Sequence, residues 1–167
     1  MSSKIISIVI YIMVIKIKEL ATGKHAGLYV IRMRKADKDF LKLGMSINLK
    51  QRLNSYVPCS PIEGFTIEAL WILKDDKLPI AKKPRYSTVY KLESELKLLM
   101  KDFFSHRAKI NTNRKEIYED KGSKIVLDAA KESLQTLANK HKDLTAGLHL
   151  NPIPTILEVD GLAGRTI

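Results

Sequence analysis

The stretch from Gly27 to Tyr56 constrains the fold of this chain more than any other, because two apolar runs flank a short polar break. Both runs are rich in residues that suit a pleated, half-buried surface, and the break from Lys35 to Asp39 is polar enough to form a turn. The pattern therefore predicts a β-hairpin whose first strand opens at Gly27-Leu28-Tyr29 and whose second strand closes at Leu43-Gly44.

A short helix is predicted directly after the hairpin. Ser46 is the expected N-cap, and Leu49, Leu53 and Tyr56 recur at helical spacing to form a narrow apolar stripe. Arg52 lies beside this stripe, so its guanidinium group is expected at the edge of the sheet that the helix covers. The sequence thus predicts a fixed cation next to the hairpin.

Basic charge is concentrated in the same part of the chain. Lys and Arg number 29 against 18 Asp and Glu, which gives a net charge of +11. Six of these eleven excess charges fall within residues 21–60. Such a concentrated positive field favours a polyanionic partner and salt-sensitive binding. A solubilising surface charge or attraction to an anionic membrane would produce the same composition.

A third strand and a helix are predicted further along the chain. Residues 65–73 alternate so that Phe65, Ile67, Ala69 and Trp71 share one face. A loop from Asp75 to Arg85 follows, and then a helix from Ser87 or Thr88 to about Phe104. The predicted buried stripe of this helix consists of Val89, Leu92, Leu96, Leu99 and Phe103, widened by Met100 and Phe104.

Two carboxylates of that helix lie in different surroundings. Glu93 is expected against apolar neighbours, where an ionised group is costly unless it is paired or binds a metal. An ion pair with Lys97 at i+4 is the alternative role for Glu93. Glu95 is expected on the more open edge, in a solvated ion pair.

The C-terminal part is predicted to contain one more amphipathic helix, Ile125 to Lys140, with Val126, Ala130, Leu134 and Leu137 on its apolar face. An extended tail is expected after Gly147. Together these elements predict an α+β fold with a small three-stranded antiparallel sheet flanked by helices. The expected divisions are an N-terminal apolar segment and linker (1–25), a central domain (26–120), and a C-terminal helix and tail (121–167).

The most apolar stretch is residues 5–15, which is shorter than the roughly 20 residues that a membrane-spanning helix needs. Lys16 follows at once without a small-residue cleavage pattern, so a buried strand is favoured over an anchor or a signal peptide. An intracellular, non-secreted protein is expected. The one cysteine, Cys59, excludes an internal disulfide and a cysteine-built zinc site.

The hairpin motifs resemble a known family. Gly27-Leu28-Tyr29, then Lys42-Leu43-Gly44, then Arg52 in a helix opening, resemble the paired motifs and arginine of the GIY-YIG endonucleases. Lys42 stands where the second motif commonly has tyrosine, and this variant is similar to the branch found in phages and large DNA viruses.

Two later segments extend the resemblance over roughly residues 26–120. Residues 92–99 are similar to the helix that supplies the metal-binding glutamate of that family, with Glu93 at the matching place. Residues 114–118 resemble a charged-then-aromatic signature that closes the domain in the viral branch.

The resemblance implies a metal-dependent endonuclease that hydrolyses phosphodiester bonds in DNA, in the cytoplasm or at a site of viral DNA replication. Glu93, or alternatively Glu95, would hold Mg²⁺ or Mn²⁺, and Arg52 would contact the phosphate. Tyr29 would be the base or the water-positioning group. The reference pKa of tyrosine, about 10, is too high for a base at neutral pH unless a nearby cation favours the phenolate. Lys42 is the candidate for that cation.

Six further basic residues are candidate nucleic-acid contacts: Arg32, Arg34, Lys50, Lys82, Lys83 and Arg85. The expected partner is DNA, or RNA, without a small-molecule cofactor, and the sequence leaves the oligomeric state open. A basic nucleic-acid-binding module without activity is the alternative, since it needs only the hairpin and the cluster at residues 82–85. A membrane-associated protein anchored by residues 5–15 is the third interpretation.

Overall fold

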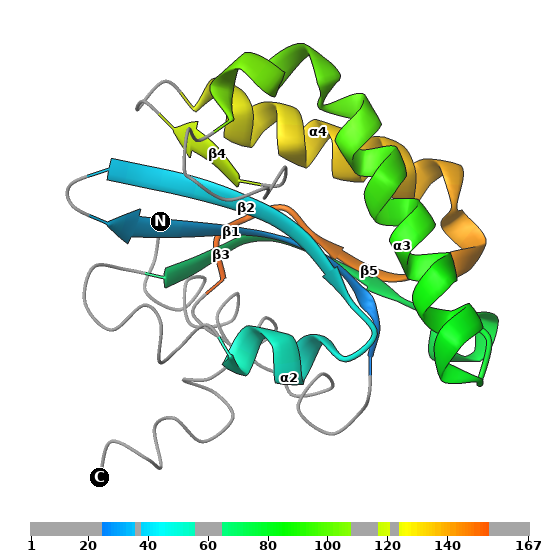
Figure 1. Ribbon diagram of the computed structural model, residues 1–167. Helices are drawn as coiled ribbons and strands as arrows, with labels where there is room; N and C mark the ends of the chain where they lie inside the picture. Colours follow the sequence, from blue (N-terminus) through cyan, green and yellow to red (C-terminus); the bar gives the residue numbers. More distant parts are fainter. Residues whose placement is uncertain (1–24, 36–37, 56–64, 108–116, 121–123, 154–167) are drawn as a thin grey trace, which may run out of the picture.

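A five-stranded antiparallel sheet forms the centre of the computed structural model, with strand order β4-β2-β1-β3-β5 (Figure 1). The structure describes residues 25–35, 38–55, 65–107, 117–120 and 124–153. The strands are β1 (Gly27–Lys35), β2 (Lys38–Ser46), β3 (Phe65–Leu73), β4 (Ile117–Asp120) and β5 (Thr145–His149). The α+β class is confirmed, and the sheet has two more strands than the three predicted.

The predicted hairpin is confirmed as β1 and β2, which pair from Gly27 opposite Ser46 to Lys35 opposite Lys38. In this register Tyr29 lies opposite Gly44, so the two motifs face each other across the ladder. β4 pairs with β2 only from Asp39 to Lys42. The end of β2 that contains Gly44 therefore extends beyond β4.

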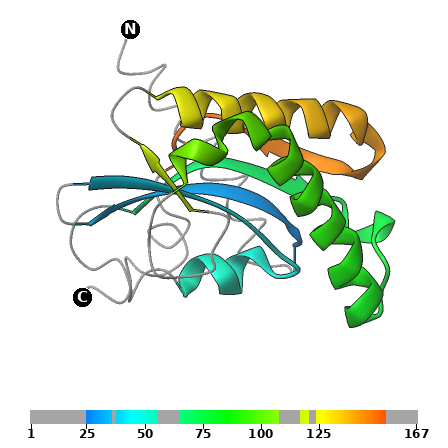
Figure 2. The ribbon, with the colours of Figure 1, turned by 45° about the horizontal axis from the view of Figure 1, so that its top comes forward.

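Helices cover the two faces of the sheet unequally, as Figure 2 shows: α3 (Lys82–Leu99) and α4 (Ile125–Lys140) lie on one face and the short α2 (Leu49–Asn54) on the other. The larger core lies under α3 and α4 and includes Leu28, Val30, Leu41, Leu43, Trp71, Leu92, Leu96 and Leu134. The smaller core lies on the side of α2 and includes Tyr29, Ile31, Leu49, Leu53, Ile67 and Ile72.

The predicted alternation of β3 is wrong at one point. Ala69 and Trp71 face the larger core as expected, but Ile67 packs in the smaller core. The pairing with β1 explains this, because Val30 lies opposite Ala69 whereas Ile31 lies opposite Ile67, which leaves one extra residue in β3. A β-bulge of this kind reverses the side chains that follow it.

The helix after the hairpin is confirmed, but its cap is not Ser46. Asn48 is the N-cap, and its side chain accepts a hydrogen bond from the backbone N–H of Gln51 at 3.1 Å. Ser46 instead accepts from the N–H of Asn48 at 2.9 Å and donates to its carbonyl at 2.8 Å. Leu49 and Leu53 are fully buried as predicted, while Tyr56 lies outside the described residues.

The start of α3 also differs from the prediction. The segment Lys82-Lys83-Pro84-Arg85 was assigned to a loop but forms the first turn of the helix. Backbone N–H groups of a first turn have no intrahelical acceptor, so Pro84 is tolerated there. A 3₁₀ turn, η1 (Asp75–Lys77), precedes α3, and another, η2 (Lys101–His106), replaces the predicted continuation to Phe104.

The buried stripe of α3 contains Val89, Leu92, Leu96 and the adjoining Met100. Leu99, which was predicted to be in the stripe, is 43% exposed because α3 ends there and the chain tightens into η2. Phe103 is only partly buried against the core, and Phe104 is exposed.

The C-terminal helix is confirmed with the predicted bounds and apolar face. After it come η3 (Lys142–Leu144) and then β5, where the sequence predicted an extended tail after Gly147. β5 pairs with β3, and the indole N–H of Trp71 donates to Thr145 Oγ1 at 3.0 Å. Ile153 forms a further antiparallel bridge to Ile67. The residues that follow Gly147 therefore extend the sheet as far as Ile153.

Several sequence predictions fall outside the described residues, namely those for residues 5–15, Cys59 and residues 114–116. Among the residues that are described, no helix is both long enough and apolar enough to cross a membrane.

Candidate functional site

The phenol of Tyr29 lies across Gly44. A Cβ added at Gly44 would collide with the hydroxyl oxygen of Tyr29 and would come within 2.8 Å of its Cε2. Tyr29 is 2% exposed and belongs to the core on the side of α2. Gly44 is thus required because a tyrosine ring occupies the volume of its missing side chain. This contact joins the two hairpin motifs into one structural unit.

Gly27 is fixed by a second close approach. A Cβ at this position would collide with the carbonyl oxygen of Trp71 and lie 2.9 Å from Leu49 Cδ1. The backbone of β3 and the first residue of α2 therefore both press against the start of β1. The N–H of Leu49 also donates to the carbonyl of His25 at 2.8 Å, which ties α2 to the same strand end.

Lys42 and Arg52 lie on the same side of the sheet as the phenol. Side chains two residues apart in a strand share a face, so Lys42 projects from β2 on the face of Gly44. Arg52 is exposed on α2, which covers this face. Tyr29 and Lys42 thus share the face of the sheet that α2 covers, and Arg52 belongs to α2 itself.

Glu93 comes from the other helix layer. It is a buried residue of α3, with 9% of its surface exposed. Its Oε1 forms an ion pair with Lys97 Nζ at a distance of 2.7 Å. Figures 1 and 2 show α3 running from that layer past the strand end at which β1 begins and β2 finishes. Glu93 thus belongs to the helix layer on the face of the sheet opposite to that of the phenol.

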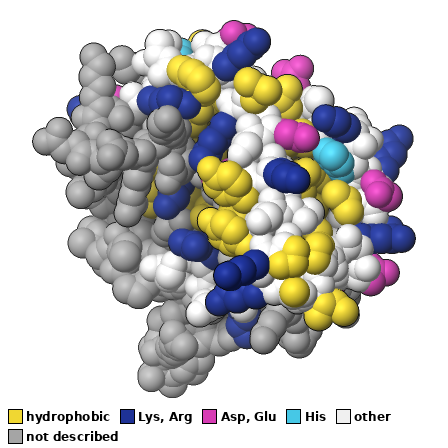
Figure 3. All heavy atoms as spheres, turned by 45° about the vertical axis from the view of Figure 1, so that its right-hand side comes forward, with side chains coloured by type: hydrophobic (Ala, Val, Ile, Leu, Met, Phe, Trp, Pro, Cys, Tyr) yellow, Lys and Arg dark blue, Asp and Glu magenta, His cyan; other side chains and the backbone are white. Residues whose placement is uncertain are grey.

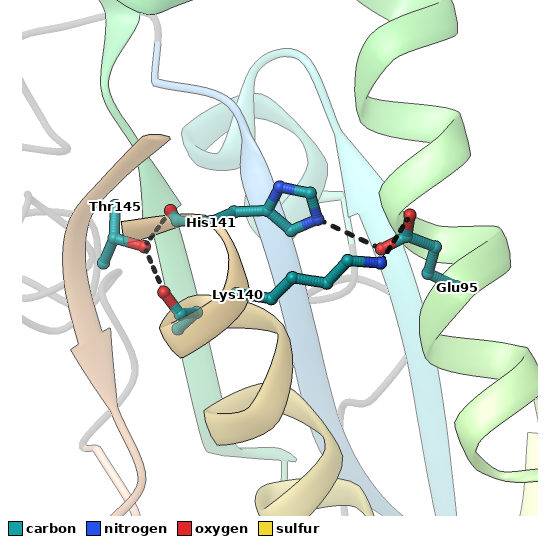
Figure 4. Close-up of polar contacts among 5 residues, drawn as sticks. Glu95, Lys140, His141 and Thr145 are labelled. Carbon is teal, nitrogen blue, oxygen red and sulfur yellow. Dashed lines mark hydrogen bonds and ion pairs between the residues drawn. The ribbon is translucent and has the colours of Figure 1, made fainter. Parts of the chain in front are cut away.

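Glu95 links α3 to the end of α4, as Figure 4 shows. Its carboxylate lies 3.6 Å from Lys140 Nζ and 3.1 Å from His141 Nε2. The carbonyl of His141 in turn accepts from Thr145 Oγ1 at 3.0 Å. Glu95 therefore has a partly exposed ion pair, as the sequence predicted, and its oxygens are engaged in joining two helices.

The six predicted nucleic-acid contacts have different surroundings. Arg32 Nε donates to the buried Glu68 at 2.9 Å, and Arg32 Nη1 lies 3.4 Å from Asp39, so its charge is compensated within the sheet. Arg85 is likewise paired with Asp75. Lys82 and Lys83 are exposed and Lys50 is partly buried, while the side chain of Arg34 lies outside the described structure.

The described residues can hold a hard divalent cation only together with ligands supplied by water or substrate. No three His, Cys, Asp or Glu side chains within the described ranges are grouped as metal ligands. Mg²⁺, however, commonly keeps several waters and takes one or two carboxylates together with substrate phosphate. Glu93 fits that pattern as a single carboxylate ligand, provided that the cation displaces the ammonium group of Lys97.

His25, the last residue of the predicted linker, lies at the strand end where its carbonyl accepts from the N–H of Leu49. Its Nδ1 is buried without a hydrogen-bond partner among the described residues. Its position two residues before Gly27 of the first motif was the available signal. A ring nitrogen of this kind can donate to or accept from a bound group.

A family model described as the T5orf172 domain matches residues 26–137 of the chain. The chain belongs to the T5orf172 domain family. The match spans more than half of the 167 residues, and its range contains β1 to β4, α2 and α3. The T5orf172 domain is a phage-associated domain of nuclease-related proteins, and nucleic acid is the partner class that it indicates. No curated protein and no solved structure gives a significant match to the chain.

Proposed function

We propose that this T5orf172 domain is a metal-dependent endonuclease of the GIY-YIG type, which hydrolyses phosphodiester bonds in DNA. The observation that carries the proposal is the contact between Tyr29 and Gly44. It gives the two hairpin motifs a joint purpose, because the glycine of one motif makes room for the phenol of the other. Family membership supports the nuclease-like class.

Each residue of the site has a distinct task in this mechanism. Arg52 donates to the phosphate oxygens, for which a planar, permanently charged guanidinium is well suited. Tyr29 orients the attacking water at its hydroxyl, or accepts its proton, and Lys42 supplies the neighbouring positive charge. A Mg²⁺ or Mn²⁺ ion bound at Glu93 would relieve the negative charge that develops on the phosphate.

The test is nicking of supercoiled plasmid in the presence of Mg²⁺. We expect Arg52→Ala and Glu93→Ala to lower the rate about 100-fold or more, since removing one electrostatic stabiliser typically costs that much. Glu95→Ala is the matched control, because it removes a carboxylate from the same helix without touching the proposed site. Its rate should stay within about threefold of wild type. Circular dichroism verifies that all three variants are folded.

Two results would contradict the proposal. Wild-type rates for both Arg52→Ala and Glu93→Ala would remove these residues from the chemistry. Retention of DNA at low salt without Mg²⁺-dependent nicks would instead favour a binding module without activity, whose affinity falls steeply with salt.

A further inference from the structure

Two tyrosines on the outer side of α3 form an exposed stacked pair. Tyr86 and Tyr90 are 49% and 50% exposed, and their ring centroids lie 6.1 Å apart with an interplanar angle of 17°. Nearly parallel, offset rings at this distance are a favourable arrangement. About half of each side chain remains in contact with water. The pair thus presents aromatic surface that the fold itself does not use.

The pair lies on the same side of α3 as Glu93. Tyr86, Tyr90 and Glu93 are spaced by four and then three residues, which places them in one row along a helix. With a rise of 1.5 Å per residue, the Cα of Tyr90 is about 4.5 Å from that of Glu93 along the helix axis, and that of Tyr86 about 10 Å. The aromatic surface therefore adjoins the carboxylate to which the metal is assigned.

Two basic side chains precede the pair on α3. Lys82 and Lys83 are exposed in the first turn of α3, one turn before Tyr86, and this turn contains no acidic residue. Asp75 of the preceding η1 is neutralised by Arg85. Figure 3 shows this side of the molecule, where hydrophobic side chains and Lys or Arg side chains lie next to each other. Aromatic rings beside lysines suit a ligand that has both flat bases and phosphates.

We propose, on the basis of the nuclease function proposed above, that Tyr86 and Tyr90 form a platform on which an unpaired base of the substrate stacks. Lys82 and Lys83 hold the adjoining phosphates. In an intact duplex both faces of each internal base are already stacked, so only a single-stranded or frayed nucleotide has a free face. The substrate class is therefore DNA with unpaired nucleotides beside the cleaved bond.

The experiment measures binding in EDTA, so that cleavage does not contribute. The probes are a single-stranded oligonucleotide and a matched duplex with a single-stranded extension, each with one 2-aminopurine base, together with a blunt duplex. For the wild type we expect tighter binding to the two probes with unpaired bases than to the blunt duplex. Stacking on the tyrosines should also change the 2-aminopurine fluorescence.

Substitutions separate stacking from simple hydrophobic contact. We expect Tyr86→Ala and Tyr90→Ala each to weaken binding of the unpaired probes about tenfold. Tyr86→Phe with Tyr90→Phe should bind like wild type, whereas the double leucine variant should bind as weakly as the alanine variants. Leu98→Ala is the control, since this exposed apolar residue lies on the same helix and should have no effect.

The lysines have a different expected signature. Lys82→Gln with Lys83→Gln should reduce the slope of log affinity against log salt by about one to two, because fewer counterions are released. Wild-type affinity of the alanine variants for unpaired probes would overturn the platform. Wild-type affinity of the leucine variant would also overturn it and point to an apolar protein surface instead.

The binding result is independent of the nuclease test. If plasmid nicking is absent but the alanine variants still lose affinity for unpaired DNA, the platform is supported and the nuclease proposal fails. If nicking depends on Glu93 but the alanine variants bind unpaired DNA normally, the nuclease proposal is supported and the platform proposal fails.

Discussion

At the residue scale, the contact between Tyr29 and Gly44 sets the position of the phenol in this hairpin. The ring fills the space over the glycine, which constrains the direction of the hydroxyl. A residue with a Cβ at position 44 would turn the phenol away. Close packing in protein interiors makes such a single-carbon change costly.

Gly44→Ala is therefore expected to lower the free energy of unfolding by about 1–3 kcal/mol, through overpacking. Urea denaturation followed by Trp71 fluorescence provides the measurement. Gly147→Ala is the matched control, because the nearest atoms to a Cβ there lie at ordinary contact distances of 3.7 and 3.9 Å. Equal stability of the two variants would contradict the close approach at Gly44.

Lys42→Met is expected to slow plasmid nicking about tenfold at neutral pH and to move the pH optimum upward. An ammonium group nearby favours the anionic form of a phenol, so its removal means that a higher pH is needed for the same anionic fraction. The pH profile of the nicking rate tests this. Lys38→Met is the control, from the same face of β2 but at the other end of the strand. An unchanged profile for Lys42→Met would exclude Lys42 from the mechanism.

At the scale of the elements, the bulge in β3 decides which side chains reach which core. Glu68 is the extra residue of this bulge; it is only 5% exposed and is paired with Arg32 of β1. Arg32 also reaches Asp39 of β2, so one guanidinium joins three neighbouring strands. This arrangement gives Arg32 a structural role.

Arg32→Met should destabilise the fold by about 1–3 kcal/mol, because the carboxylate of Glu68 would be left buried without this partner. The double variant Arg32→Met with Glu68→Leu should recover most of that loss, since replacing both members of a buried pair is often neutral. Urea denaturation of the single and double variants measures the difference. A double variant less stable than the single one would disagree with this interpretation.

Helix α3 illustrates how a local pattern can identify an element but misplace its end. The stripe of Val89, Leu92 and Leu96 was predicted correctly, because helical spacing is a local property. The first turn was missed, because two prolines and three basic residues within residues 79–85 are typical of a loop. The pairing of Arg85 with Asp75, across the turn before the helix, was not visible in the spacing.

At the scale of the whole molecule, α4 and β5 complete the fold around the hairpin. α4 buries Val126, Leu127, Leu134 and Leu137 on the core under the helices, and β5 covers the edge of β3. Burial of each such side chain contributes about 1.5–3 kcal/mol. Their sum is comparable to the total stability of a typical domain, about 5–15 kcal/mol.

A chain truncated after Asp120 is therefore expected not to fold cooperatively, although a domain boundary was predicted there. The emission of Trp71, the one tryptophan of the sequence, should shift to longer wavelength, because the residue would lose the cover of β5 and the hydrogen bond to Thr145. A chain truncated after Ile153 is the control, since it retains every contact described here. Cooperative unfolding of the shorter chain would show that the predicted central domain, residues 26–120, forms an independent unit.

The hairpin, the helix after it, the third strand and the C-terminal helix were predictable, because each depends on the spacing of apolar residues within one short segment. The sequence by itself also determined the basic charge around the hairpin and the residues of the two motifs. Only the tertiary structure decided that the phenol of Tyr29 rests on Gly44, that β4 and β5 widen the sheet, and that α3 buries Glu93 while it exposes a stacked tyrosine pair. These depend on strand register and on packing between distant segments, and a local pattern contains no information about which distant surfaces meet.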